Sequence, residues 1–183
     1  MKLVAVIEEL LEGPAHCGST HVIAIDGRAG AGKTTLANEL ALALSLRRQV
    51  TVIHLDEIYA GWDLALTQSL TDSLSYILKT LASERPVSVP IYDWQLEEFN
   101  SNREISPCDV IIIEGVGSAQ QVVREMATTS IWIDIDREAG LLRVLDRDGS
   151  AIEEQMNRWQ IREEAHFLSD ATRENADFIL STF

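Results

Sequence analysis

Eight residues from Gly27 to Thr34 carry the clearest chemistry in this sequence, reading Gly-Arg-Ala-Gly-Ala-Gly-Lys-Thr. The run fits G-x-x-x-x-G-K-[ST], in which glycines let backbone N–H groups approach phosphate oxygens. Lys33 is placed to reach the β- and γ-phosphates of a nucleoside triphosphate, and the Thr34 hydroxyl is suited to bind Mg²⁺. The alternative is a glycine-rich turn without a ligand. We expect a nucleotide site formed by Gly27, Arg28, Ala29, Gly30, Ala31, Gly32, Lys33, Thr34 and Thr35.

Two carboxylates follow predicted buried strands. Asp56 comes after residues 49–55, and Glu114 comes after residues 109–113. Ligands of parallel sheets bind at the carboxyl ends of the strands. Asp56 can accept a proton from an attacking hydroxyl or hold magnesium through water, and Glu114 is suited to the same metal. The alternatives are that Asp56 caps a turn and that Glu114 is a solvated residue at a strand end.

Aromatic side chains flank an acid in Tyr92-Asp93-Trp94. Such rings can stack on a flat ligand while the acid binds a hydroxyl. A hydrophobic hairpin with one exposed acid explains the same residues equally well. Apolar residues alternate from Val87 to Ile91, so residues 87–104 are predicted to form a hairpin or an irregular loop.

Three arginines fall on two predicted helices late in the chain. Arg143 and Arg147 are four residues apart and share a helical face, and Arg158 lies on the next helix. In so acidic a chain, fixed guanidinium charges are suited to close over phosphates. The alternative is salt bridges to nearby acids, among them Asp146, Glu154 and Glu163.

These residues need a framework, which the apolar pattern predicts. Short apolar runs indicate five buried strands, at 21–26, 49–55, 109–113, 131–135 and 178–180. Helical spacing indicates helices at 2–12, 33–46, 64–83, 138–147 and 152–168. Strands that alternate with helices favour a parallel sheet covered on both faces. We therefore predict one α/β domain over residues 1–183, with a leading helix within 1–14: a three-layer α/β/α sandwich of the P-loop NTPase type with a parallel five-stranded sheet.

The charge composition of the chain limits the kinds of molecule that it is expected to bind. The chain of 183 residues has 15 Lys plus Arg and 29 Asp plus Glu, a net charge of −14. This balance disfavours nucleic acid and anionic membranes, because both are bound through clustered cations. Cys17 and Cys108 lack the spacing of a metal site and are expected to be reduced thiols. No apolar run approaches the roughly 20 residues of a membrane span, so we expect a cytoplasmic protein. The oligomeric state stays open.

Taken in order, the motifs resemble the uridine kinase and phosphoribulokinase branch of the P-loop kinases, from about Val22 to Leu180. Besides the P-loop, the resemblance rests on four segments. They are Asp56-Glu57-Ile58-Tyr59, similar to D-S-F-Y; Pro90-Ile91-Tyr92-Asp93-Trp94, similar to P-x-Y-D-F; Glu114-Gly115-Val116, similar to E-G-I; and residues 136–148, similar to an arginine-bearing lid entry. Many NTPases share a P-loop, whereas this ordered set is much more specific.

The resemblance implies a role for each matching residue. Asp56 would be the general base for an acceptor hydroxyl and would help to hold magnesium. Thr34 and Glu114 would be the metal ligands. Arg143 and Arg147 would act on the transferred phosphoryl group.

The resemblance also implies an acceptor site. Tyr59, Tyr92 and Asp93 would line it together with Asp56, and residues 87–104 would form an insertion beside it. Arg158 stands where the family has a polar residue of the acceptor site.

The chain departs from the family in two places. The family commonly has a longer lid with a second arginine pair, whereas here Gly149 follows Arg147-Asp148 at once, so residues 137–158 would form a short helical lid. Uridine kinases place a histidine and an arginine soon after Y-D-F, whereas this chain has Gln95-Leu96-Glu97-Glu98. The two extra acids disfavour an anionic acceptor.

The main hypothesis is an ATP-dependent small-molecule kinase with Mg²⁺ as cofactor. Asp56 would deprotonate a hydroxyl of a nucleoside-like or other neutral polyol acceptor, while Lys33 and the arginines stabilise the transferring phosphoryl group. Two alternatives remain. An ATP-binding regulatory module predicts slow hydrolysis that no small hydroxyl compound accelerates, and a kinase of a nucleotide or coenzyme precursor predicts stimulation by a phosphorylated acceptor.

Overall fold

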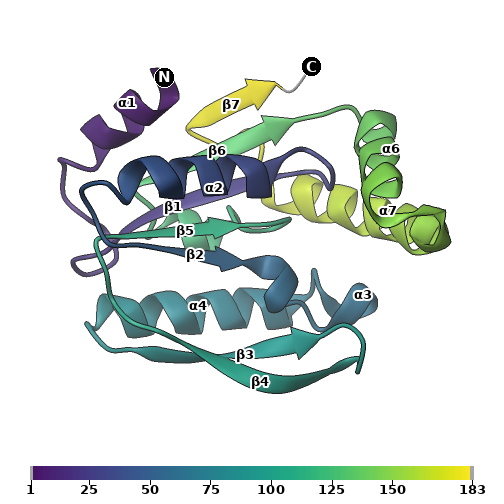
Figure 1. The fold of residues 1–183 in the computed structure, drawn as a ribbon, viewed down its shortest axis with the longest axis horizontal. Helices are drawn as coiled ribbons and strands as arrows, with labels where there is room; N and C mark the ends of the chain where they lie inside the picture. Colours follow the sequence, from purple (N-terminus) through teal and green to yellow (C-terminus); the bar gives the residue numbers. More distant parts are fainter. Residues whose placement is uncertain (1, 182–183) are drawn as a thin grey trace.

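A computed structural model describes residues 2–181, and its middle layer is a parallel sheet (Figure 1). The strands run in the order β2-β5-β1-β6-β7, and every neighbouring pair is parallel. Every residue of β1 and β5 is buried, which is why these strands are nearly continuous apolar runs in the sequence. The predicted five-stranded parallel sheet is confirmed. Its strands are β1 (His21–Gly27), β2 (Val50–His54), β5 (Val110–Glu114), β6 (Thr129–Asp134) and β7 (Phe178–Ser181).

Helices cover both faces of this sheet. On one face lie α1 (Lys2–Leu10) and α2 (Lys33–Leu44), and on the other lie α4 (Gln68–Ala82), α5 (Gln121–Arg124) and α7 (Glu153–Asp170). Alternate residues of β1 enter the two layers, because successive side chains of a strand point to opposite faces. Ile23 and Ile25 pack with α1 and α2, whereas Val22 and Ala24 belong to the core on the other side. The predicted α/β/α sandwich is confirmed.

The helix predicted at 64–83 is observed as α4, which begins at Gln68, and the separate short helix α3 (Gly61–Leu64) precedes it. The break lies at Thr67, whose backbone is extended and whose hydroxyl donates to the Leu64 carbonyl at 2.8 Å. The short elements η1 (Leu55–Glu57), η2 (Ser150–Ile152) and α5 were not predicted. Each has only three or four residues, too few for a periodic pattern.

Residues 87–105 form an antiparallel hairpin apart from the main sheet, made of β3 (Val87–Asp93) and β4 (Glu98–Ile105). Figure 1 shows it beside α4, with its β3–β4 turn on the same side of the molecule as α3. The buried residues Val87, Val89 and Ile105 join the core beneath α4. Of the two possibilities that the sequence left open for this segment, the hairpin is the one observed.

The helix α6 (Arg137–Asp148) and the start of α7 lie at the carboxyl ends of the strands (Figure 1). Asp136 caps α6 by accepting hydrogen bonds from the backbone N–H groups of Glu138 and Ala139. The P-loop, between β1 and α2, lies at the same end of the sheet. Within residues 2–181, no helix has both the length and the apolar character needed to cross a membrane.

Candidate active site

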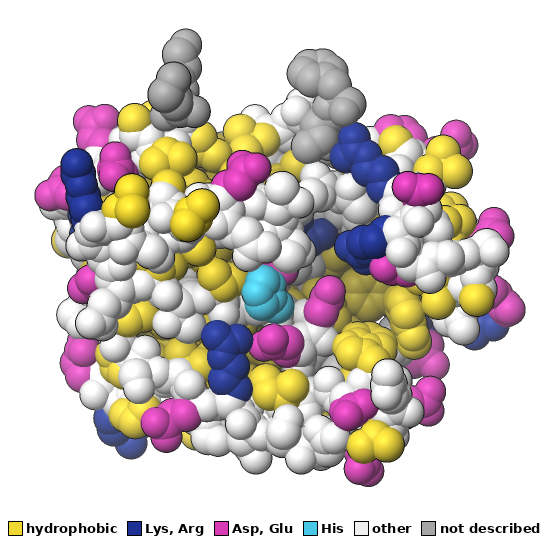
Figure 2. Space-filling model, viewed as in Figure 1, with side chains coloured by type: hydrophobic (Ala, Val, Ile, Leu, Met, Phe, Trp, Pro, Cys, Tyr) yellow, Lys and Arg dark blue, Asp and Glu magenta, His cyan; other side chains and the backbone are white. Residues whose placement is uncertain are grey.

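A pocket of about 470 Å³ opens at the carboxyl ends of the strands. Figure 2 shows a hollow with hydrophobic side chains on its floor and with basic and acidic side chains at its edge. The pocket brings together predicted residues from separate segments of the chain: Lys33, Thr34, Asp56, Glu114, Arg143 and Arg147.

The P-loop forms one wall of this pocket. The Lys33 ammonium donates to the carbonyl oxygens of Gly27 and Arg28, at 2.8 and 2.9 Å, so it is held within the loop. An ideal Cβ on Gly32 would meet no protein atom within 4 Å, so the space above the loop is open to a ligand. An open cradle of backbone at a helix N-terminus, with a lysine inside it, fits a triphosphate.

Three of the predicted P-loop positions do not line the pocket. Ala31 and Gly27 are buried, and the Arg28 side chain turns toward α7, where it pairs with Glu163 and Glu164. The Arg28 guanidinium is therefore not placed to contact a phosphate. The lining positions are Ala29, Gly30, Gly32, Lys33, Thr34 and Thr35.

Thr34 and Glu114 meet beside the loop. The Thr34 hydroxyl donates to Glu114 Oε1 at 3.0 Å, and His54 Nδ1 lies 2.6 Å from the same oxygen. A hydroxyl and a carboxylate suit Mg²⁺, which binds through one or two protein oxygens together with substrate phosphates and water. Among residues 2–181, no group of three or more His, Cys, Asp or Glu side chains is arranged to hold a metal ion by itself. The residues present therefore fit a magnesium ion that binds together with the nucleotide.

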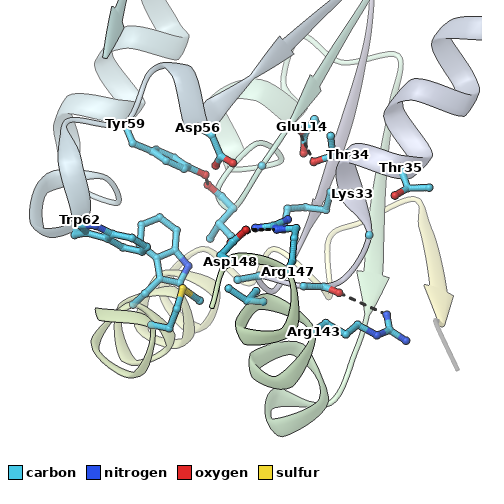
Figure 3. A pocket seen from close by; sticks show the side chains of 18 of the residues that line it. Lys33, Thr34, Thr35, Asp56, Tyr59, Trp62, Glu114, Arg143, Arg147 and Asp148 are labelled. Atoms are coloured by element: carbon cyan, nitrogen blue, oxygen red, sulfur yellow. Dashed lines mark hydrogen bonds and ion pairs between the residues drawn. The ribbon is translucent and has the colours of Figure 1, made fainter. Parts of the chain in front are cut away.

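Asp56 lies in η1, directly after β2, and its side chain points into the pocket (Figure 3). Burial by the surrounding protein raises the pKa of this carboxyl above its usual value, while the Lys33 ammonium acts in the opposite direction. The nearby Glu114 adds to the rise. A carboxylate with a raised pKa is a stronger base, as proton abstraction from a hydroxyl requires.

Two of the three predicted arginines line the pocket, both from α6. Arg143 Nη1 lies 3.5 Å from the carbonyl oxygen of Gly30, in the P-loop. Arg147 makes two hydrogen bonds to Asp148, at 2.7 and 2.6 Å, and these raise its pKa. Figure 3 marks the Arg147–Asp148 pair in the pocket, and the charges of Arg147 and Lys33 both lower the pKa of Asp56.

Arg158 does not reach the pocket. It is exposed and pairs with Glu154 one turn earlier on α7. Met156 and Trp159 of the same helix do line the pocket. With about 100° between successive residues of a helix, Arg158 points away from the side that those two residues present. The salt-bridge alternative therefore describes Arg158, and its geometry does not support the predicted acceptor contact.

Aromatic rings form the other end of the pocket, and we call Tyr59, Trp62, Trp94 and Trp159 the aromatic wall. Trp62 lies at the centre, with ring centroids 5.4 Å from Trp94 and 5.9 Å from Trp159. The Tyr59 ring packs against Trp159 in a tilted arrangement, with ring centroids 5.3 Å apart, and its hydroxyl donates to the Val116 carbonyl at 2.7 Å. The hydroxyl is thus engaged by the backbone, and Tyr59 offers its ring to the pocket.

The hairpin contributes Trp94 to the wall, but not Tyr92 or Asp93. Tyr92 lies behind Trp94, with ring centroids 5.3 Å apart. The Asp93 carboxylate closes the hairpin turn by accepting hydrogen bonds from Gln95 N, Leu96 N and Asn100 Nδ2, which lower its pKa. The hairpin alternative therefore describes Asp93, and a direct contact with the acceptor has no support from its position.

Sequence reasoning also missed Asp26, a fully buried residue at the end of β1. Its carboxylate accepts hydrogen bonds from the backbone N–H groups of Gly27, Gly117 and Ala119, at 2.7, 3.0 and 2.8 Å. One side chain thus joins the start of the P-loop to the segment after β5. The only signal in the sequence is an acid that ends an otherwise apolar run.

Comparison with known proteins shows the family. The model described as the Phosphoribulokinase / Uridine kinase family matches residues 64–180. A uridine kinase of Staphylococcus epidermidis is 30% identical, and the match covers 88% of this chain and 87% of the relative. The chain belongs to the phosphoribulokinase and uridine kinase family. It is an ATP-dependent phosphotransferase that acts on a small-molecule acceptor.

Solved structures of similar kinases share the fold. A candidate fructose transport system kinase of Silicibacter sp. superposes with a TM-score of 0.74 at 22% identity, covering 98% of both chains. A possible uridine kinase of Bacillus stearothermophilus has a TM-score of 0.68 at 24% identity, covering 98% of this chain and 100% of the other. The P-loop and Asp56 lie outside the residues that the family model matches, so they are candidates on their own motif and geometry.

Proposed function

We propose that this kinase transfers the γ-phosphoryl group of ATP to a hydroxyl group of an uncharged, nucleoside-like acceptor that carries a flat ring. One observation carries the proposal. A single pocket has the P-loop and the arginines of α6 toward one end and the aromatic wall at the other, with Asp56 between them (Figure 3). A ring stacked on the wall places its attached hydroxyl near Asp56 and the γ-phosphate.

Each residue then has a chemical task. Asp56 accepts the proton of the attacking hydroxyl while that oxygen bonds to the γ-phosphorus, the bond from this phosphorus to the β–γ bridging oxygen breaks, and ADP leaves. Lys33, Arg143 and Arg147 stabilise the negative charge on the transferring phosphoryl oxygens. Magnesium, for which Thr34 and Glu114 are the suited ligands, would neutralise the β- and γ-phosphates when bound.

The charges around the pocket favour an uncharged acceptor. Among the described residues, the cations that line the pocket are Lys33, Arg143 and Arg147. All three lie at the phosphate end, where the nucleotide uses them. Arg103 and Arg162 do not line the pocket and pair with Glu57 and Asp63 instead. A phosphorylated acceptor would thus bring its charge to aromatic rings and to Asp56, which disfavours a nucleotide or coenzyme precursor.

The test is ADP release from Mg·ATP in the presence of nucleosides, sugars, vitamins and nucleoside monophosphates. Lys33→Ala serves as the blank, and Lys79→Ala, an exposed lysine at the end of α4, serves as the matched control with full activity. The proposal predicts strong stimulation by one neutral, ring-bearing compound. Stimulation by a monophosphate alone would contradict it, and a flat panel with ATP still bound would favour a regulatory module.

A further inference from the structure

A buried acid of α7 that the reaction does not use directly, Glu163, touches both ends of the pocket. Its side chain is 0% exposed. Its Oε2 atom accepts one hydrogen bond from the backbone N–H of Ala29, in the P-loop, and one from the indole N–H of Trp159, in the aromatic wall. Both distances are 3.1 Å. One carboxylate oxygen therefore joins the nucleotide loop to the acceptor wall.

The charge of Glu163 is compensated within the loop. Its second oxygen, Oε1, lies 3.5 Å from Arg28 Nη1, and Arg28 also pairs with Glu164. Burial raises the pKa of Glu163, and the Ala29 N–H and the charges of Lys33 and Arg28 oppose the rise. Arg28 thus offsets part of the negative charge of Glu163 and Glu164 beside the phosphate cradle.

We infer that Glu163 is a positioning residue that couples the P-loop to the aromatic wall, so that nucleotide binding at Ala29–Thr35 sets the position of Trp159 before the acceptor binds. A buried hydrogen bond to a carboxylate is stronger than one between neutral groups, and leaving its donors unpaired is costly. The hydrogen bonds of Glu163 therefore hold the P-loop and the aromatic wall in a fixed relative position. This position favours phosphoryl transfer only when both the nucleotide and the acceptor are bound.

The inference rests on the proposed function in one respect, namely that the aromatic wall binds the acceptor. Its test needs no acceptor. The dissociation constant of Mg·ATP is measured by calorimetry, and the change in tryptophan fluorescence on saturation with Mg·ATP is measured in the same samples. The variants are Glu163→Ala, Glu163→Gln and Trp159→Phe. Glu164→Gln is the matched control, because Glu164 shares the Arg28 ion pair but has no bond to Ala29 or Trp159.

We expect Glu163→Ala to weaken Mg·ATP binding about tenfold, the equivalent of one hydrogen bond to a charged group. It should also abolish most of the fluorescence response, even at saturating nucleotide. Trp159→Phe should remove the same part of the response, and the double variant should lose no more than either single one. Glu163→Gln should recover most of both properties, because its amide oxygen can still accept from Ala29 and Trp159.

A merely structural Glu163 would lower the melting temperature in Glu163→Ala and leave the fluorescence response at saturation unchanged. That result, or a wild-type protein whose fluorescence ignores bound Mg·ATP, would overturn the inference. Should Glu163→Ala not fold, Trp159→Phe decides the matter, because it also removes the hydrogen bond between Glu163 and Trp159, and a full wild-type response in Trp159→Phe would contradict the inference. A failed acceptor panel with these results intact would contradict the proposed function alone.

Discussion

Gly30 and Gly140 bring the P-loop and α6 into direct backbone contact. An ideal Cβ on Gly30 would lie 2.3 Å from the carbonyl oxygen of Gly140, and one on Gly140 would lie 2.6 Å from that of Ala29. Neither position has room for a side chain. The helix that carries Arg143 and Arg147 is therefore seated on the loop that receives the phosphates, and the arginines are positioned by this contact.

Gly140→Ala should disturb the backbone contact between α6 and the P-loop. The added methyl group must push α6 away from Ala29, because a backbone carbonyl cannot move aside as a flexible side chain can. Since displacements of about 1 Å can cost up to about a hundredfold in rate, we expect kcat/KM for ATP to fall at least tenfold or so. Steady-state kinetics with Leu142→Ala as the control checks this, because Leu142 is an exposed residue of the same helix. Equal kinetics for Gly140→Ala and wild type would contradict the tight seat.

Glu114→Gln should weaken the use of magnesium. The Thr34 hydroxyl and His54 both contact Glu114 Oε1, so the change removes a charge and disturbs a hydrogen-bonded group. We expect the Mg²⁺ concentration for half-maximal activity to rise about 10- to 100-fold. Titration of Mg²⁺ at constant free ATP measures this. The control is Glu104→Gln, which changes an exposed acid on β4. An unchanged Mg²⁺ requirement in Glu114→Gln would contradict the role of Glu114 as a metal ligand.

Asp26→Asn should destabilise the fold and loosen the P-loop. The carboxylate accepts from Gly27, Gly117 and Ala119 through both of its oxygens. In Asn, an amide NH₂ group would replace one of the two oxygens. It would face a backbone N–H, and because both groups are donors, no hydrogen bond could form between them. We expect a loss of about 1–3 kcal/mol in the free energy of unfolding, measured by urea denaturation. Asp146→Asn, on the exposed side of α6, should change it little, and an Asp26→Asn variant as stable as wild type would refute this account of Asp26.

The framework was predictable because its signals are local. The P-loop is defined by consecutive residues, and each buried strand appears as a short apolar run. The positions of Asp56 and Glu114 then follow from the ends of their strands. Asp93 shows the limit of this reasoning. Its carboxylate accepts a hydrogen bond from the backbone N–H of Gln95, two residues later, which is a common way for an aspartate to stabilise a turn. The sequence could not tell which use the fold makes of it.

The connections between the parts of the site were not predictable. Glu163 and Ala29 are 134 positions apart, and His54 and Glu114 are 60 apart. No spacing rule links residues on different elements; only the packed fold brings them together. The aromatic wall is a similar case, because its rings come from the segment after η1, from α3, from the hairpin and from α7. For Arg158 the helix was predicted, but the direction in which the Arg158 side chain points from that helix was not.

The most direct test of the central claim is Asp56→Asn, assayed with the acceptor that the panel identifies. Formation of the phosphorylated acceptor is followed by mass spectrometry, and Mg·ATP binding is measured in parallel, with Asp72→Asn, an exposed acid on α4, as the control. If Asp56 is the base, transfer should slow by about 10²- to 10⁴-fold while Mg·ATP binding stays close to that of wild type. Transfer at the wild-type rate in Asp56→Asn would contradict the claim that this carboxylate deprotonates the acceptor.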